Sequence, residues 1–469
     1  MKIRGAVKIL NDNELNKIEA SAIQILTNTG INLQNSYMLK ILAEHGWPTD
    51  MSKETVFFPP NQLEEFLQDS EQLDWDNLPP LRIQGGLYTW QWLPPDADKP
   101  KPATIESTVN LTRLGDYLDN IDTMCGMGTP SDVPKQILPL WQYFISWRYA
   151  AKTNSSAGGI FNRECIPYLK EMGSIMAAEK GGTARDYVSL GMELISPLRF
   201  GRYEAEVYYQ CYQEGLAVGL MSMPSLGGTA PVTLAGACAL QLAEIWACNI
   251  LNRVFYGTKK LYYISAISVI DMRQGFWRFG RPESALLHMA LGQLAYKRGA
   301  AFTANCFACD AKRPSVEAGY QKALDTIPAI LAGTIGTGSC GMLSLDEYNS
   351  PIQLILDNEF AGALKRMTAG FDISDETLAL DLINRIGPGG NYLAELHTAK
   401  NFRTEIWFPK IWTGLSDSGW MGAGCKLDID YARDIYEEVM KNYHPRGISE
   451  KTEKKLMDVI KTAEEKIVT

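Results

Sequence analysis

The stretch from Asp271 to Ser284 combines several residue types that can bind a small charged molecule. It holds acidic and basic residues, three aromatic residues and two glycines, and it runs into a predicted helix over residues 282–298. A loop of this composition in front of a helix is typical of a binding site. Arg273 is a candidate partner for a carboxylate, and Phe276 and Trp277 are candidate aromatic faces for an organic cation. For any single aromatic residue, packing is the more common role.

A second loop, Ser225 to Thr233, lies between a predicted strand and a predicted helix that begins near Pro231. Gly227, Gly228 and Thr229 would expose backbone N–H groups at the start of that helix. Such groups bind a carboxylate or a phosphate. A tight strand-to-helix turn without a ligand explains the same glycines, so both interpretations stay open.

Cys306 and Cys309 form a Cys-x-x-Cys pair at the end of a predicted strand, and Asp310 follows directly. A zinc site needs about four ligands, and the sequence offers no second such pair and no paired histidine motif. We therefore predict no metal site here. Asp310 is the stronger candidate, because polar residues that follow a barrel strand tend to face the site.

Short apolar runs alternate with helical patterns over most of the chain. This alternation predicts a parallel sheet covered by helices, and about eight repeats indicate an α/β fold of the (β/α)8 TIM barrel type. An open doubly wound sheet is the main alternative, but no Gly-x-Gly-x-x-Gly motif follows a first strand. The predicted strands are 121–127, 154–160, 187–194, 217–223, 254–256, 264–269, 300–307 and 335–338, and the predicted helices between them are 166–178, 203–216, 231–251, 282–298 and 315–332.

We expect three parts in the chain. Residues 1–110 form an N-terminal α+β elaboration, residues 111–400 the barrel, and residues 401–469 a helical C-terminal extension. Helices are also predicted at 14–28, 375–386 and 429–442, and residues 451–466 are predicted to form a charged helix with a solvated face.

Composition narrows the function classes. The 469 residues carry a net charge of −9, and a general nucleic-acid binder would more often be basic. No run of eighteen apolar residues predicts a membrane span, and no signal peptide is visible, so we expect a cytoplasmic protein. Nine cysteines at irregular spacing indicate reduced thiols. With four histidines and no Gly-x-Ser-x-Gly, P-loop or His-Glu-x-x-His motif, histidine acid–base chemistry is not expected. Glu244, in the apolar helix 231–251, is expected to be structural and to pair with Arg253 or Arg273.

Several segments together resemble the trimethylamine methyltransferase superfamily, over roughly residues 10–460. The resemblance implies a TIM barrel that moves a methyl group from an amine to the Co(I) of a separate corrinoid protein, with no cofactor held permanently in this chain. It rests on Leu114–Asp122, Gly227–Gly236 with Leu242–Glu244, Asp271–Gly275 with Gly280–Glu283, and Ile386–Gly390 with His397 and Thr398.

One departure from the superfamily bears on the substrate. Its trimethylamine enzymes carry pyrrolysine, whose position would fall in or near Gly336–Leu345, whereas this chain has only ordinary residues. A quaternary amine already carries a full positive charge and leaves as a neutral tertiary amine, so it needs no proton donor. The chain is thus similar to the non-pyrrolysine members, of which glycine betaine:corrinoid methyltransferases are the best-known type. Proline betaine, carnitine and butyrobetaine are the alternative substrates.

The resemblance implies roles for the candidate residues. Phe276, Trp277, Phe307 and Tyr348 would hold a trimethylammonium group, and the Gly227–Thr229 turn, Arg273 or Arg313 would hold a carboxylate. Asp310 would add negative charge near the cation, so Asp310 and Tyr348 are the expected catalytic residues. Because no proton moves, positioning and water exclusion would supply the catalysis.

Other classes remain open. A TIM-barrel lyase or aldolase would need a metal triad or a reactive lysine, for which Lys312 is the candidate. A non-catalytic quaternary-amine binding protein is usually exported, and a scaffold would not explain the loop chemistry. The expected partners are a corrinoid protein and further copies of the chain, since apolar segments such as Trp407–Trp412 could bury against a second subunit.

Overall fold

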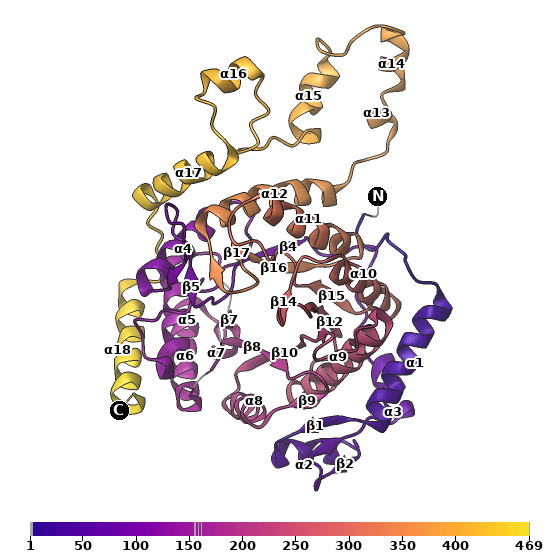
Figure 1. Cartoon of the computed structure of the whole chain (residues 1–469), viewed down its shortest axis with the longest axis vertical. Coiled ribbons are helices and arrows are strands. Elements are labelled where there is room, and N and C mark those ends of the chain that lie inside the picture. Colours follow the sequence, from indigo (N-terminus) through magenta and orange to yellow (C-terminus); the bar gives the residue numbers. More distant parts are fainter. Residues whose placement is uncertain (1–2, 154–155, 158, 161, 469) are drawn as a thin grey trace.

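Parallel strands gather in the middle of the molecule, and helices surround them (Figure 1). The computed structural model describes residues 3–468 apart from 154–155, 158 and 161. Part of the predicted strand 154–160 therefore lies outside the described residues. The chain has a mixed α/β fold, as expected.

The central strands pair with one another in parallel, in several short sheets. Strand β7 pairs with β8, β8 with β10, β12 with β15, and β16 with β4. Single parallel bridges at Gln84–Thr123 and Met124–Thr153 continue from β4 towards β7. No ladder joins β10 to β12 among the described residues. The strand bounds are β4 Arg82–Gly85, β7 Ser156–Ala157, β8 Ser189–Leu194, β10 Ala217–Ser222, β12 Tyr262–Ser265, β15 Ala301–Ala304 and β16 Gly336–Cys340.

Long helices cover the outside of these strands, because their apolar residues need burial. They are α4 Ile105–Tyr117, α5 Leu138–Tyr149, α6 Ile166–Lys180, α8 Arg202–Glu214, α9 Leu234–Tyr256, α10 Pro282–Lys297, α11 Val316–Leu331 and α12 Pro351–Ala369, with short helices η1 Lys135–Ile137, η2 Arg163–Cys165 and α7 Ala184–Tyr187 between them. The predicted helices 166–178, 203–216, 231–251, 282–298 and 315–332 are confirmed within a few residues.

Helix α9 is apolar almost all round. It is long and apolar enough to cross a membrane by length and composition, yet 83% of that segment is buried inside the chain, as in a core helix. It lies against α1, β10 and β12. The predicted strand 254–256 is wrong, because these residues continue the hydrogen bonding of α9 up to the cap at Gly257.

The N-terminal part is a small α+β unit. Asn11 and Glu14 form a capping box that starts α1, and β1 pairs with β3 and also with β9 from the middle of the chain. Strand β4, from the predicted N-terminal part, pairs in parallel with β16; the boundaries at 110 and 400 stay predictions. The elements are α1 Asp12–Asn28, β1 Ile31–Leu33, α2 Ser36–Glu44, β2 Thr49–Asp50, β3 Thr55–Val56, α3 Pro60–Gln68, β5 Gln91–Trp92, β6 Lys101–Pro102 and β9 Arg199–Phe200.

Two C-terminal helices pack back onto the body. Helix α17 (Asp428–Asn442) lies on α12 and α4, and α18 (Glu450–Ile467) lies on α6 and α5. The helix predicted at 451–466 is confirmed, and its charged residues form a solvated face, but its opposite face is buried. Its apolar residues recur at helical spacing and form a buried stripe of Leu456, Val459, Ile460 and Ala463.

Residues 371–427, hereafter the arm, project away from the body (Figure 1). The arm contains α13 (Asp375–Leu378), α14 (Leu380–Ile386), α15 (Leu396–Glu405) and α16 (Asp417–Gly422). The predicted helix 375–386 is broken at Ala379, which has a φ of +51°. None of these four helices has a buried residue.

Candidate functional site

A cavity of about 480 Å³ is lined by residues of β4, β8, β10, β12, β15 and β16 and of the loops that follow them. One part of its wall is apolar, and another part carries polar side chains, so the space suits a small molecule with both characters. The apolar part includes Leu87, Met221, Met223, Ile264, Phe279 and Met342, and the polar part includes Arg82, Gln84, Tyr88, Glu193, Asn305 and Asp346.

Glu193 and Asp346 are the two acidic residues in this wall. Burial raises the pKa of both carboxyl groups, and the negative charge of Asp346 raises the pKa of Glu193 further. Burial also raises the pKa of the Tyr88 phenol, with added contributions from Glu193 and Asp346, so the three groups lie near one another. No lysine or arginine of the described chain forms an ion pair with either carboxylate. The described part of the chain therefore supplies no ion-pair partner for either acid.

Asp346 sits in a short loop between β17 (Met342–Leu343) and β18 (Tyr348–Asn349). The Leu345 N–H donates to the Cys309 carbonyl (2.7 Å), and Ser344 and Leu345 have φ values of +54° and +71°. These contacts fix the loop on the segment that follows β15, and so they fix Asp346 at the cavity.

Tyr348 and Lys312 fasten the same two segments from outside the cavity. The Tyr348 hydroxyl donates to the Lys312 carbonyl (2.6 Å), and the Lys312 ammonium donates to the Ser344 hydroxyl (2.6 Å). Tyr348 thus holds the loop that carries Asp346. Lys312 does not line the cavity, which removes the support for a lyase with this lysine as its reactive group.

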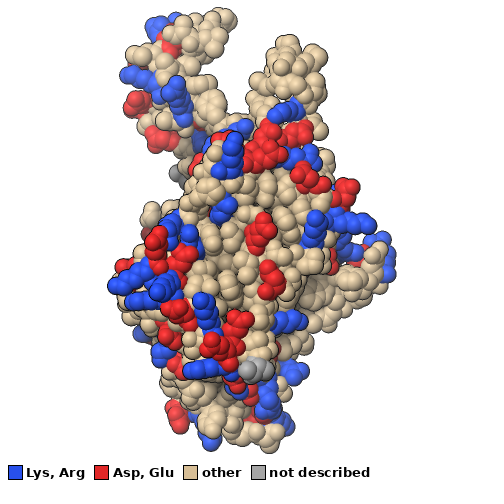
Figure 2. Space-filling view, turned by 90° about the vertical axis from the view of Figure 1, so that its left-hand side faces the viewer, with Lys and Arg blue, Asp and Glu red and all other residues tan. Residues whose placement is uncertain are grey.

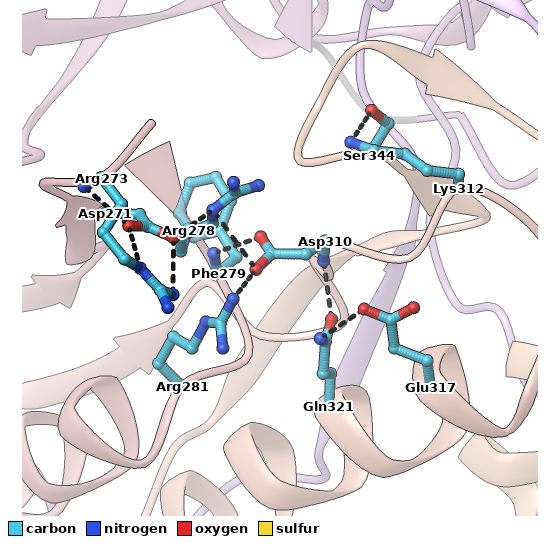
Figure 3. Close-up of polar contacts among 10 residues, drawn as sticks. All are labelled: Asp271, Arg273, Arg278, Phe279, Arg281, Asp310, Lys312, Glu317, Gln321 and Ser344. Carbon is cyan, nitrogen blue, oxygen red and sulfur yellow. Dashed lines mark hydrogen bonds and ion pairs between the residues drawn. The ribbon is translucent and has the colours of Figure 1, made fainter. Parts of the chain in front are cut away.

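Asp310 is the centre of a second polar network (Figure 3). Its carboxylate accepts the backbone N–H of Phe279 (3.0 Å) and an ion pair from Arg281, and Arg278 lies 4.0 Å away. Its own backbone N–H donates to Gln321 (2.7 Å). Asp310 is 5% exposed and does not line the cavity. It positions Phe279, which does.

The expected aromatic residues lie elsewhere. Phe276 and Trp277 are in β14 (Phe276–Arg278), which forms a hairpin with β13 (Ser268–Asp271), and their exposures are 59% and 45%. Phe307 is fully buried against Phe360, with ring centroids 5.5 Å apart, so its face is not free for a cation. Phe279, near the end of the hairpin, is the aromatic residue of this segment in the cavity wall.

The predicted basic residues point into solvent. Arg273 is 88% exposed along its side chain and pairs with Asp271 at 3.2 Å, as Figure 3 shows. Arg313 pairs with Asp98 at 2.9 Å, and both are largely exposed. Neither lines the cavity.

The Gly227–Thr229 segment is a closed turn. The N–H of Gly227 donates to Ala230, the N–H of Gly228 donates to Ser225 (3.1 Å), and the Thr229 hydroxyl accepts the N–H of Ser225 (2.9 Å). The glycine N–H groups have no remaining capacity for an anion, and α9 begins later, at Leu234. The structure thus favours the tight turn, which leads from β11 (Ser225–Leu226), over the anion site.

Glu244 is buried but unpaired with arginine, contrary to expectation. It accepts hydrogen bonds from the Ser196 hydroxyl and the Leu198 N–H, both at 2.8 Å. Burial raises the pKa of its carboxyl group. Arg253 instead pairs with Asp69 (3.5 Å).

The Cys-x-x-Cys pair does not form one site. Burial raises the pKa of both thiols. Cys306 lies with His288 and Asp325 in a fully buried cluster, whereas Cys309 lies outside it. His288 bridges the Ser265 hydroxyl (2.7 Å) and Asp325 (3.3 Å), which joins β12, α10 and α11.

Glu193, Asp346 and Tyr88 were missed as site residues. Glu193 is a charged residue inside the predicted strand 187–194, and Tyr88 lies close to Trp90 and Trp92 in the sequence. Either feature could have indicated a binding site. The segment Gly336–Leu345, singled out by the resemblance, does contribute to the cavity wall through Gly336, Thr337, Gly338, Ser339 and Met342.

Comparison with known proteins identifies the family. The family model described as trimethylamine methyltransferase (MTTB) matches residues 94–468. Curated relatives include the trimethylamine methyltransferase MttB of Desulfitobacterium hafniense, 24% identical over 97% of this chain and 94% of the relative, and a glycine betaine methyltransferase of the same species, 25% identical over 96% of each. The monomethylamine methyltransferase MtmB of Methanosarcina barkeri has a solved structure with a TM-score of 0.46 and 14% identity, covering 96% of this chain and 94% of that one. Because the family model spans most of the sequence, the chain belongs to the trimethylamine methyltransferase (MTTB) family.

Proposed function

We propose that the protein moves a methyl group from a quaternary amine to the Co(I) of a corrinoid carried by a separate protein. The observation that carries this proposal is a pair of acidic residues, the half-buried Glu193 and the more exposed Asp346, which line a partly apolar cavity without an ion-pair partner among the described residues. Acidic groups beside apolar walls and without a basic partner favour a ligand of opposite charge.

The rest of the cavity suits a methylated ammonium ion. Methionine, leucine, isoleucine and phenylalanine side chains give the methyl groups an apolar wall, and the faces of Phe279 and Tyr88 attract a cation. A quaternary ammonium has no N–H to donate, so it needs diffuse negative charge and not a specific acceptor. The two carboxylates provide that charge.

The proposed scaffold is a (β/α)8 barrel. Seven named strands and the bridged segment at residues 123–124 supply eight parallel elements in ring order. The N–H of Ile335 donates to the Phe302 carbonyl (2.8 Å), which joins β15 to the start of β16. No ladder joins β10 to β12 among the described residues, and we propose that these two strands lie side by side and so close the barrel.

In this mechanism the chain binds and orients the cation, and the corrinoid Co(I) is the methyl acceptor. Glu193 and Asp346 hold the ammonium, the apolar wall excludes water, and the tertiary amine leaves without gaining or losing a proton. Catalysis then comes from alignment of one methyl group with the incoming acceptor. The exposed hairpin residues Met272, Phe276 and Trp277 lie next to Phe279 in the chain and offer the partner an apolar surface beside the cavity.

Glycine betaine is the first candidate substrate, supported by the relative that carries this name. Its carboxylate needs a basic partner, and Arg82 is the single lysine or arginine among the residues that line the cavity. Arg82 begins β4, whereas Tyr88 follows the end of that strand, Glu193 is near the end of β8, and Asp346 follows β16 and β17. This separation favours a second candidate, a methylated ammonium ion that has no carboxylate.

The test is methylation of a reduced Co(I) corrinoid by the purified protein, followed in the visible spectrum. Glycine betaine, proline betaine, carnitine, butyrobetaine, tetramethylammonium and trimethylamine are supplied in turn. Methyl-Co(III) formed with one of the quaternary amines supports the proposal and identifies the substrate. Binding of a quaternary amine without methyl transfer to any corrinoid protein would indicate the non-catalytic binding class instead, and neither binding nor transfer would exclude both.

A further inference from the structure

Three side chains that can bind a metal ion meet in the interior of the chain, apart from the cavity. His288 of α10, Asp325 of α11 and Cys306, which follows β15, are each at most 1% exposed, and none of them lines the cavity. One ligand atom of each residue lies within 4.8 Å of the other two. Because the three residues come from separate segments, no short sequence motif indicates this cluster.

Two polar atoms of the cluster lack a hydrogen bond. Nε2 of His288 and Oδ1 of Asp325 lie 3.3 Å apart, but neither forms a hydrogen bond with the other or with any other described residue. The hydroxyl of Thr326, the next residue along α11, is also buried without a hydrogen-bond partner. Buried polar atoms in folded proteins are nearly always satisfied, so these three atoms indicate a bound ion or water molecule.

The charge of the cluster favours a cation over a water molecule. On the face shown in Figure 2, many acidic side chains lie among lysines and arginines. Asp325 differs, because it is buried and forms no ion pair with a lysine or arginine of the described residues. A neutral water molecule would leave this carboxylate uncompensated. A divalent metal ion would be balanced by one carboxylate and one thiolate, with a neutral imidazole as the third ligand.

His288 already has the orientation of a metal ligand. Its Nδ1 lies 2.7 Å from the Ser265 hydroxyl. When Nδ1 carries the proton and donates it to this hydroxyl, Nε2 keeps a free lone pair on the side of Asp325. Histidines that bind metal ions in proteins usually donate their second N–H in this way, which fixes the ring and its tautomer.

We propose that the cluster binds one Zn²⁺ through His288 Nε2, Cys306 Sγ and Asp325 Oδ1, with the Thr326 hydroxyl as the fourth ligand. Zinc accepts nitrogen, sulfur and oxygen in one site, whereas Mg²⁺ and Ca²⁺ prefer oxygen alone. Zinc–ligand bonds of about 2.0–2.3 Å place the ligand atoms of a tetrahedral site roughly 3.3–3.8 Å apart. The three donors therefore need to approach one another by on the order of 1 Å at most.

Zinc at this position would have a structural role. It would join the segment after β15 to α10 and α11. Ser265 and Cys306 are next in sequence to Ile264 and Asn305, which line the cavity, so the metal would support the cavity wall from behind. Because no zinc ligand lines the cavity, this inference does not depend on the proposed methyl transfer.

The test measures zinc in the tag-free, full-length protein by mass spectrometry after treatment with EDTA. The wild type should keep about one zinc ion per chain, because the ligands are buried. Cys306→Ser and Asp325→Asn should each keep far less zinc, since loss even of an outer-shell partner costs roughly tenfold or more in affinity. The matched control is Cys309→Ser, which removes a buried thiol outside the cluster and should keep the wild-type amount.

X-ray absorption of the wild type tests the same site without any variant. It should show one sulfur ligand at about 2.3 Å from the zinc, together with nitrogen and oxygen ligands at about 2.0 Å. Equal zinc in the wild type and in Cys306→Ser, or a zinc shell without sulfur, would overturn the proposal and indicate adventitious binding at the surface. Wild type that holds no zinc when produced with zinc in the medium would also overturn it, and would assign the cluster to an ion pair between protonated His288 and Asp325.

Discussion

The cavity and the arm depart from ordinary protein surfaces in opposite directions. The cavity is lined by two acids, Glu193 and Asp346, that form no ion pair with a lysine or arginine of the described chain. The arm exposes large apolar residues, and two of its acids form ion pairs, Glu395 with Arg385 and Glu405 with Arg366 of α12. Acidic groups without a basic partner beside apolar walls, and large exposed apolar side chains, are both unfavourable in an isolated chain. Each departure indicates a missing partner, which in the cavity is a cation.

The largest effect is expected when the negative charge of the cavity is removed. Glu193→Gln with Asp346→Asn should lower the rate of corrinoid methylation by roughly 100-fold or more, because two desolvated charges that attract the substrate are lost. The matched control is Glu171→Gln with Asp458→Asn, which changes exposed acids on α6 and α18 and should leave the rate unchanged.

The same double variant should not lose stability. Burial raises the pKa of both acids, so ionisation of each opposes folding above its raised pKa, and the neutral amides remove that penalty. The Tm at neutral pH should stay equal or rise by about 1–2 °C. A fall in Tm together with the lost activity would mean that the acids have a structural role.

The variant Asp310→Asn tests a residue that does not line the cavity but holds one that does, Phe279. We expect roughly a tenfold loss in kcat/KM, since the weakened network no longer fixes the backbone of Phe279. Asp98→Asn is the control, because its pair with Arg313 is exposed and should contribute little. A pH profile of kcat that shifts in Asp310→Asn would instead indicate that Asp310 acts in the reaction itself.

As the pH falls, cation binding should weaken at a higher pH than it would if the two carboxyl groups had ordinary pKa values. The pKa values of Glu193 and Asp346 are raised, so protonation begins above the usual range of about 4–4.5 as the pH falls. The Kd of tetramethylammonium, measured by calorimetry, should therefore rise severalfold between neutral pH and that range. Glu193→Gln should flatten this dependence, and an equally steep curve in the variant would assign it to other groups.

The smallest effect is expected in the Gly227–Thr229 turn. Thr229→Val removes the hydroxyl that accepts the Ser225 N–H and should cost about 1 kcal/mol in the free energy of unfolding, as measured by urea denaturation. The KM for glycine betaine should not change. An increase in KM without loss of stability would instead indicate that this turn binds the carboxylate of the substrate.

Local patterns predicted the helices well. Pro282 at the start of α10 and the apolar residues of α9 are signals within a few turns of sequence, and both helices were placed within a few residues. Strand β4 was assigned to the N-terminal elaboration, because its partner β16 lies some 250 residues away and no local signal records that pairing. The apolar stripe by which α18 packs on the body is visible in the sequence, but the many charged residues of this helix directed the prediction to its solvated face.

The site was harder to predict, because the direction of a side chain depends on how segments far apart in the sequence pack together. Asp310 follows β15, but its carboxylate turns towards Arg278 of β14 and Arg281 at the start of α10 and not into the cavity. Phe276 and Trp277 were placed at the site, but the β13–β14 hairpin carries them outward and leaves Phe279 at the cavity. Glu193 faces inward only because β8 lies in the ring with that side towards the centre.

The most direct measurement is the affinity of tetramethylammonium for the wild type and for Glu193→Gln, by calorimetry at neutral pH and in the absence of any corrinoid protein. Binding by the wild type that weakens tenfold or more in the variant is the predicted result, since the probe carries no carboxylate and tests the cavity charge alone. Equal affinity in the two proteins, or no binding by folded wild type, would contradict the assignment of the cavity as a cation site.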